Sequence, residues 1–151
     1  MKIKRIIIAI IIPLLVGFIG NLLGNASNGF DSINKPEFTP PGIVFPIVWT
    51  ILYILMGISS YFIYQSNNKD KENALIIYGI QLFVNMLWTL FFFRLHLYLF
   101  SFIWILIMII LVGLMIYKFY KIDKKAGVIQ IPYLIWLIFA SIINFSVYLL
   151  N

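Results

Sequence analysis

Five long apolar stretches, separated by short polar segments, dominate the hydropathy pattern of the chain. Each lacks charged residues and is long enough for an α-helix to cross a bilayer, which takes about 20 residues. The stretches do not alternate between apolar and polar positions as membrane β-strands do. They cover residues 6–24, 43–64, 74–93, 97–117 and 128–150. The pattern predicts an all-α integral membrane bundle of five transmembrane helices, built as one domain over residues 1–151.

Composition supports a membrane protein. Hydrophobic residues make up 63% of the chain and charged residues 11%. Soluble domains carry about 45–50% apolar residues and about 25% charged residues. The first stretch follows the basic segment MKIKR, as the apolar core of a signal peptide would. That core is usually only about 7–15 residues long, so we expect an uncleaved helix.

The basic residues predict the orientation of the bundle. Nine of the eleven fall on the side of the N-terminus: Lys2, Lys4, Arg5, Lys69, Lys71, Lys118, Lys121, Lys124 and Lys125. Only Lys35 and Arg94 fall on the other side. The excess of Lys and Arg in cytoplasmic segments places the N-terminus in the cytoplasm and the C-terminus outside. Because these residues form short tracts between apolar stretches and not a basic groove, we expect no nucleic-acid partner.

The ionisable residues argue against the common membrane enzymes and pumps. All five carboxylates and His96, the only histidine, lie between the apolar stretches, and the chain has no cysteine. Proton-coupled transporters need ionisable groups inside the membrane, and metal sites need His, Cys or carboxylate clusters. We therefore expect no metal site, and no conventional catalytic motif supports an enzyme.

Polar amides and large aromatic residues recur at helical spacing inside the stretches. Gln81, Asn85 and Trp88 share one helix face, because residues four and seven apart do so. The same spacing relates Trp49, Tyr53 and Met56 in the second stretch, whereas Trp136, Ala140 and Asn144 in the fifth repeat every four residues. At about 1.5 Å of rise per residue, Asn21, Trp49, Asn85, Trp88 and Asn144 lie roughly 5–12 Å below the outer surface. By the same rise Tyr53, Gln81 and Trp136 lie roughly 15–21 Å down.

The long connection over residues 25–42 lies above this polar layer and carries Phe30, Ile33 and Phe38. We expect it to be an ordered cap and not a disordered tether, because it is rich in aromatic and apolar side chains. Apolar walls with a few directed polar groups are typical of a ligand pocket. In the alternative interpretation the amides only join helices, and the tryptophans only anchor the protein at the interface. Gly20 and Gly24 form a GxxxG pair that marks a close helix contact or a dimer face.

A pocket of aromatics and amides without charge suits a flat, largely apolar ligand with polar edges. Porphyrins and sterols both fit, and indoles can stack on the extended π-system of a porphyrin. Haem iron requires an axial ligand such as His or Cys, and the layer contains neither. Metal-free porphyrin, bound as a ligand, is therefore favoured, and no cofactor is required.

Three motifs resemble the TspO/MBR (translocator protein) family across nearly the whole chain. The first is NKPEFTPP at 34–41 followed by Phe45, VWT at 48–50, LY at 52–53 and MG at 56–57. The second combines QL at 81–82 with Asn85, Trp88 and FF at 91–92. The third combines PY at 132–133 with Trp136, FA at 139–140 and Asn144. The chain departs from the family pattern at Gly29 and Phe38, where tryptophan is common.

The resemblance implies a bacterial membrane receptor or sensor, often a homodimer, that binds tetrapyrroles such as protoporphyrin IX, and benzodiazepine-type ligands. It also implies light-dependent porphyrin degradation, with Trp49 and Trp136 as the photochemical residues. The alternative function is passive translocation of porphyrin or sterol-like lipids across the membrane. The site assigned from the layer and the resemblance together is Pro40, Pro41, Phe45, Trp49, Tyr53, Gln81, Asn85, Trp88, Trp136, Ala140 and Asn144.

Overall fold

The computed structural model describes residues 2–25, 30 and 32–151. Across these residues the chain is helical and contains no strand, and it has five helices long and apolar enough to span a membrane. In chain order the elements are α1 (Lys2–Gly24), α3 (Val44–Tyr64), α4 (Lys71–Thr89), the π-helical turn η1 (Leu90–Arg94), α5 (Tyr98–Ile122), α6 (Lys124–Ile129) and α7 (Ile131–Leu150). The prediction of an all-α bundle with five spans is confirmed.

Helix ends differ from the predicted spans where charged residues continue a helix beyond its apolar part. α5 runs on past residue 117 to Ile122, because lysine is a good helix former and does not end a helix. It ends at Asp123, whose backbone is extended and whose carboxylate accepts a hydrogen bond from the Lys125 backbone N–H at 2.9 Å. Asp123 thereby caps α6.

The fifth predicted span is divided into α6 and α7 at Gln130. Pro132 follows in the first turn of α7. Proline cannot donate the backbone hydrogen bond of a continuous helix, and its ring collides with the carbonyl four residues earlier. The break therefore lies where the sequence places this proline.

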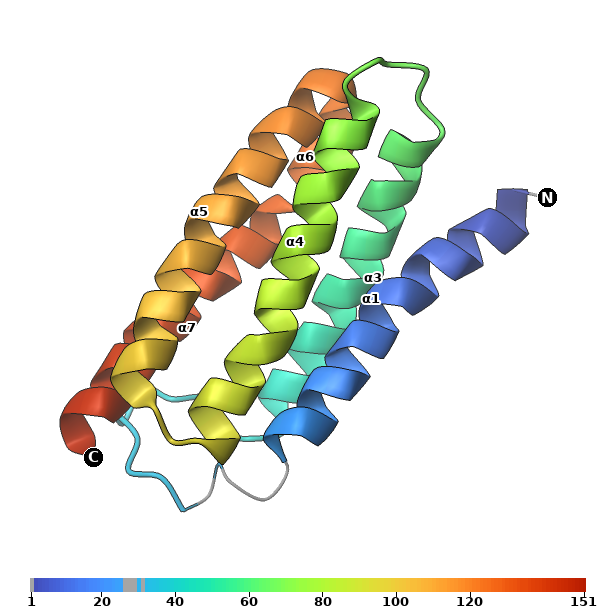
Figure 1. The fold of residues 1–151 in the computed structure, drawn as a ribbon. Helices are drawn as coiled ribbons and strands as arrows, with labels where there is room; N and C mark the ends of the chain where they lie inside the picture. Colours follow the sequence, from blue (N-terminus) through green and yellow to red (C-terminus); the bar gives the residue numbers. More distant parts are fainter. Residues whose placement is uncertain (1, 26–29, 31) are drawn as a thin grey trace.

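The helices form an elongated bundle in which α1 lies on one side (Figure 1). α5 packs against both α4 and α7, α3 contacts α6, and α1 lies across α3 and α4. Buried side chains from α3, α4, α5 and α7 fill the centre, among them Met56, Leu82, Met108, Val112 and Leu137. The amino-terminal end of α1 leans away from the other helices (Figure 1).

Glycines set the closest helix approaches. An added Cβ at Gly57 would lie 2.5 Å from the Ile10 Cα, so α1 and α3 touch backbone to backbone. An added Cβ at Gly24 would lie 2.5 Å from the Thr89 carbonyl oxygen, and Gly20 faces the backbone of Met86. The GxxxG pair therefore joins α1 to α4 within one chain.

The tight connection between α4 and α5 also holds the end of α1. His96 has a φ of 53°, in the left-handed region, where the chain reverses into α5. The Arg94 guanidinium donates hydrogen bonds to the carbonyl oxygens of Leu22 and Leu23. These carbonyls have no helical partner at the end of α1, so Arg94 supplies their missing donors.

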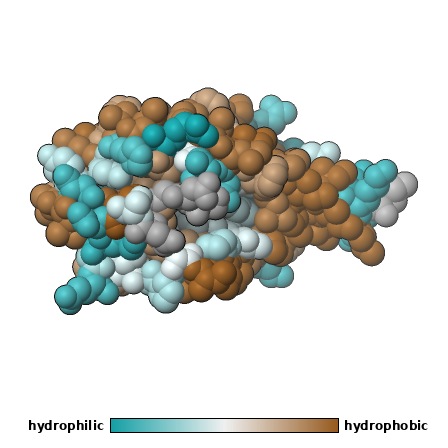
Figure 2. Space-filling model, turned by 90° about the horizontal axis from the view of Figure 1, so that it is seen from below, coloured by the Kyte–Doolittle hydropathy of each residue, from teal (hydrophilic) through white to brown (hydrophobic). Residues whose placement is uncertain are grey.

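The described part of the first connection packs over the end of the bundle, in agreement with the expected ordered cap. Ile33 is 6% exposed and packs with Phe92 and Val147. Asn34 and Asn151 exchange hydrogen bonds, with the Asn151 side chain donating to the Asn34 carbonyl oxygen at 2.9 Å. Figure 2 views this end, where hydrophilic residues gather, while the sides of the bundle are hydrophobic. Residues 26–29 and 31, which belong to the same connection, lie outside the described residues.

Candidate ligand-binding cavity

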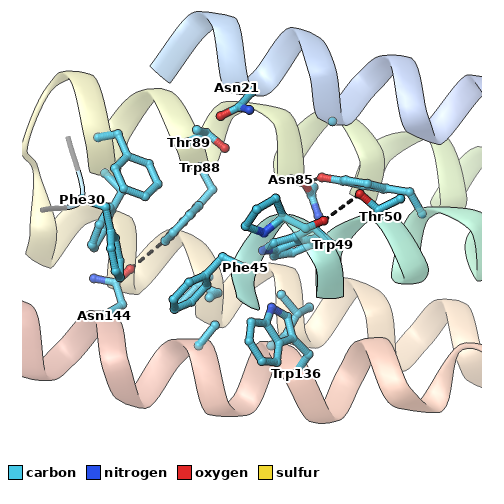
Figure 3. A pocket seen from close by; sticks show the side chains of 18 of the residues that line it. Asn21, Phe30, Phe45, Trp49, Thr50, Asn85, Trp88, Thr89, Trp136 and Asn144 are labelled. Carbon is cyan, nitrogen blue, oxygen red and sulfur yellow. Dashed lines mark hydrogen bonds between the residues drawn. The ribbon is translucent and has the colours of Figure 1, made fainter. Parts of the chain in front are cut away.

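A cavity of about 800 Å³ opens between α1, α3, α4, α5 and α7, at the end covered by the first connection (Figure 3). Its lining is mostly apolar, and the described residues contribute no charged side chain to it. The lining residues are Leu14, Gly17, Phe18, Asn21, Phe30, Gly42, Ile43, Phe45, Pro46, Trp49, Thr50, Tyr53, Asn85, Trp88, Thr89, Phe92, Phe93, Ile105, Met108, Trp136, Leu137, Ala140, Ile143 and Asn144. Drug-sized ligands usually occupy cavities of about 300–1,000 Å³.

Aromatic rings from three helices form much of the wall. The rings of Phe45 and Trp136 meet edge to face with centroids 5.7 Å apart, and those of Trp49 and Tyr53 are 5.5 Å apart. Trp88 stacks on Phe92 at 4.9 Å. Figure 3 shows the indoles of Trp49, Trp88 and Trp136 on different helices around the same space. Such a wall presents aromatic ring faces to a flat ligand.

A hydrogen-bond network joins three helices beneath the cavity. The Tyr53 hydroxyl donates to Asn85 Oδ1 at 2.8 Å, and Asn85 Nδ2 donates to the Tyr133 oxygen at 2.8 Å. The Tyr133 hydroxyl in turn donates to Gln81 Oε1 at 2.7 Å. Gln81 Nε2 approaches the Met56 sulfur at 4.0 Å. Each hydroxyl and amide is satisfied by the next, so the network fixes Tyr53 and Asn85 at the cavity surface.

A second polar contact lies nearer the loop end. The Trp88 indole N–H donates to Asn144 Oδ1 at 3.0 Å, and Asn144 Nδ2 donates to the Tyr98 carbonyl oxygen at 2.9 Å (Figure 3). The amides of Asn85 and Asn144 thus join helices, as the alternative interpretation expected, and both also border the cavity.

The Trp136 indole nitrogen is buried and has no hydrogen-bond partner within the described part of the chain. A buried donor without a partner costs free energy. Trp136 borders the cavity, so an acceptor atom on a bound molecule could satisfy this group. The Trp104 indole differs, because it donates to the Val84 carbonyl oxygen at 2.7 Å and does not line the cavity.

Most of the site residues assigned from the sequence border the cavity. These are Phe45, Trp49, Tyr53, Asn85, Trp88, Trp136, Ala140 and Asn144. Gln81 is fully buried below the cavity, behind Tyr133. Pro40 and Pro41 precede α3 and do not line the cavity.

Tyr133 and Gly17 are among the residues that the sequence assignment did not include. Tyr133 lies in the PY motif and holds the network together, but only the neighbouring helices reveal that role. Gly17 lines the cavity one helical turn before Asn21. That spacing places both on one face of α1 and was a usable signal.

Comparisons with known proteins agree with these features. The sequence profile of the TspO/MBR family matches residues 9–150. The chain is 35% identical over 153 residues to the tryptophan-rich protein TspO of Archaeoglobus fulgidus, covering 100% of this chain and 99% of that protein. It is 36% identical over 122 residues to the tryptophan-rich sensory protein of Cereibacter sphaeroides, covering 81% and 76%. It is 29% identical over 143 residues to the translocator protein of Sus scrofa, covering 91% and 85%. The chain, an integral membrane protein with a cavity ringed by indoles, belongs to the TspO/MBR family.

Proposed function

We propose that the cavity binds a tetrapyrrole such as protoporphyrin IX, and also binds benzodiazepine-type molecules. The observation that carries the proposal is a cavity of about 800 Å³ that is bordered by Trp49, Trp88 and Trp136 and receives no charged side chain from the described residues. Indoles stack on extended π-systems, and the cavity is large enough for a flat ligand of drug size or more. The role is that of a membrane receptor or sensor, in keeping with the name of the Cereibacter sphaeroides relative.

Light-dependent degradation of the bound porphyrin is part of the proposal. An excited porphyrin can take one electron from a neighbouring indole, leaving an indole radical cation and a porphyrin radical anion. Dioxygen then forms a bond to a ring carbon of the radical anion, and one electron returns to the indole radical cation. The net reaction adds dioxygen to the porphyrin and regenerates the indole. Trp49 and Trp136 are the assigned donors, because both border the cavity from different helices.

Passive translocation of porphyrin or sterol-like lipids is the second candidate, since a relative is named translocator protein. A translocated molecule must pass both halves of the bundle. The half away from the cavity is filled by side chains without exposed surface, among them Ile63, Met115 and Phe119. This packing favours binding over passage.

Titration of purified protein with protoporphyrin IX, in the dark and under light, tests the proposal. Trp49→Phe and Trp136→Phe keep an aromatic ring but remove the indole N–H, and Trp104→Phe is the matched control outside the cavity. We expect the two cavity variants to bind modestly less, since an aromatic contact of about 0.5–1.5 kcal/mol is largely kept. We expect them to lose most of the photodegradation, and the control to behave like the parent. No saturable binding to the parent protein would refute the proposed function.

Orientation and assembly complete the proposal. We place the N-terminus in the cytoplasm and the C-terminus outside, on the distribution of Lys and Arg. We also propose a homodimer. Its interface cannot use Gly20 and Gly24, because α4 of the same chain covers that face.

A further inference from the structure

α1 and α3 separate towards the end of the bundle that carries the cavity. They touch at Gly57, and Gly17 lies against the Tyr53 ring. Beyond this point Gly20 and Gly24 bring α1 onto α4. The last turns of α1 therefore lie on α4, and α1 does not cover the first turns of α3.

The separation opens the cavity on its side. Phe18 and Asn21 on α1 line the cavity, as do Pro46 and Thr50 on α3 and Ile43 beside it. All five are exposed, with Phe18 at 61% and Ile43 at 68%. We call these five residues the lateral mouth. Figure 3 shows Asn21 on α1, with Trp49 and Thr50 on α3.

The lateral mouth lies at membrane depth. Phe18 and Thr50 each lie six residues inside their helices, counted from Gly24 and Val44, which is about 9 Å at 1.5 Å per residue. Both helices are apolar enough to span a membrane. The opening therefore faces the hydrocarbon of the bilayer and not the water above it.

The chemistry of the lateral mouth suits an apolar molecule. The Thr50 hydroxyl donates to the Pro46 carbonyl oxygen at 2.6 Å, so its polar group is satisfied within α3. Phe18, Ile43 and Pro46 contribute apolar side chains, and Asn21 adds a polar amide. An amphiphile that lies near the headgroups meets a matching surface there.

The described part of the first connection packs over the end of the cavity, in contrast to its side. Ile33 is buried over that end, and the Phe30 and Phe45 rings lie 4.9 Å apart. Asn34 is hydrogen-bonded to Asn151 at the end of α7. A molecule arriving from water at this end meets these contacts, whereas one arriving through the lateral mouth does not.

We infer that the ligand enters and leaves the cavity sideways from the bilayer, through the lateral mouth between α1 and α3. The inference rests on the proposed binding of a tetrapyrrole, and it limits the ligands to molecules that can reach the cavity from the bilayer. Ligands must dissolve in the membrane, so flat amphiphiles such as protoporphyrin IX qualify and fully water-soluble porphyrins are excluded.

Two cross-links distinguish the routes, and the chain has no natural cysteine to interfere. Leu22→Cys and Ile47→Cys flank the lateral mouth on exposed positions outside the cavity lining. Asn34→Cys and Asn151→Cys join the cap to α7 at an existing contact. Each pair is bridged with a flexible bis-maleimide in liposomes, and the same variant without the bridge is the control.

Stopped-flow fluorescence then gives the association and dissociation rates of protoporphyrin IX. We expect the Leu22–Ile47 bridge to slow both rates about tenfold or more, while their ratio changes little, because a blocked route affects both directions. We expect the Asn34–Asn151 bridge to leave both rates within about twofold of its control. Slowing by the cap bridge alone, equal slowing by both bridges, or slowing by neither overturns the inference.

The dark titration separates this result from the proposed function. If the unbridged variants bind protoporphyrin IX at equilibrium but the bridge at the mouth has no effect on the rates, only the lateral route fails. If no unbridged protein binds, the proposed function fails first. As a second measurement, the observed association rate should rise with the mole fraction of porphyrin in the bilayer at constant aqueous concentration.

Discussion

Replacement of Tyr133 by phenylalanine removes one oxygen atom and disconnects the network below the cavity. The Tyr133 hydroxyl accepts a hydrogen bond from Asn85 Nδ2 at 2.8 Å and donates one to Gln81 Oε1 at 2.7 Å. Tyr133 is 1% exposed, so water cannot replace the lost partner. Tyr133→Phe therefore leaves one buried amide donor and one buried amide acceptor unsatisfied.

The magnitude follows from counting these bonds. Hydrogen bonds between membrane helices contribute on average about 0.6 kcal/mol and at most about 1.7 kcal/mol each. Two lost bonds, both short and fully buried, should cost about 2 kcal/mol on this scale. Tyr53→Phe loses only the bond to Asn85 Oδ1 and should cost about 1 kcal/mol. Tyr133→Phe should therefore lose about twice as much unfolding free energy as Tyr53→Phe.

Reversible unfolding in mixed micelles, titrated with a denaturing detergent, measures both free energies. Tyr148→Phe, at an exposed tyrosine on α7, is the matched control and should change stability by less than about 0.5 kcal/mol. Protoporphyrin IX affinity should also fall in Tyr133→Phe, although Tyr133 does not line the cavity, because Asn85 loses its anchor. The reasoning fails if Tyr133→Phe costs no more than Tyr53→Phe.

Three further outcomes are expected. Gly57→Ala should destabilise the protein by about 1–3 kcal/mol, because the added Cβ would lie 2.5 Å from the backbone of α1. The control Gly79→Ala should be neutral or stabilising, because an added Cβ there has nothing within 4 Å. Equal melting temperatures of the two variants would contradict this packing. A single cysteine in place of Lys35 should react with an impermeant maleimide on intact cells and one in place of Lys124 only after lysis, and the reverse pattern would invert the proposed topology. Replacing residues 25–42 by a Gly/Ser linker should weaken porphyrin binding at unchanged helix content measured by circular dichroism; unchanged affinity would show that the connection is only a tether.

The apolar pattern was sufficient to predict the architecture. A segment such as residues 43–64 must bury its backbone polar groups within a helix when no water is present, so length and composition alone determine that it spans. The same reasoning located Trp49, Asn85 and Asn144 in one half of the bundle, because helical rise converts position into depth. Depth and helix face are properties of one helix and can be read from its sequence.

The orientation of one helix against another required the tertiary structure. Gln81 shares a helix face with Asn85, yet it lies behind Tyr133 and outside the cavity. Gly20 and Gly24 fitted either a dimer face or an internal contact, and only the position of α4 decided between them. The lateral mouth arises because α1 changes partner from α3 to α4 along its length. Periodicity describes which residues share a face but not what covers that face, because the covering atoms come from segments distant in the sequence.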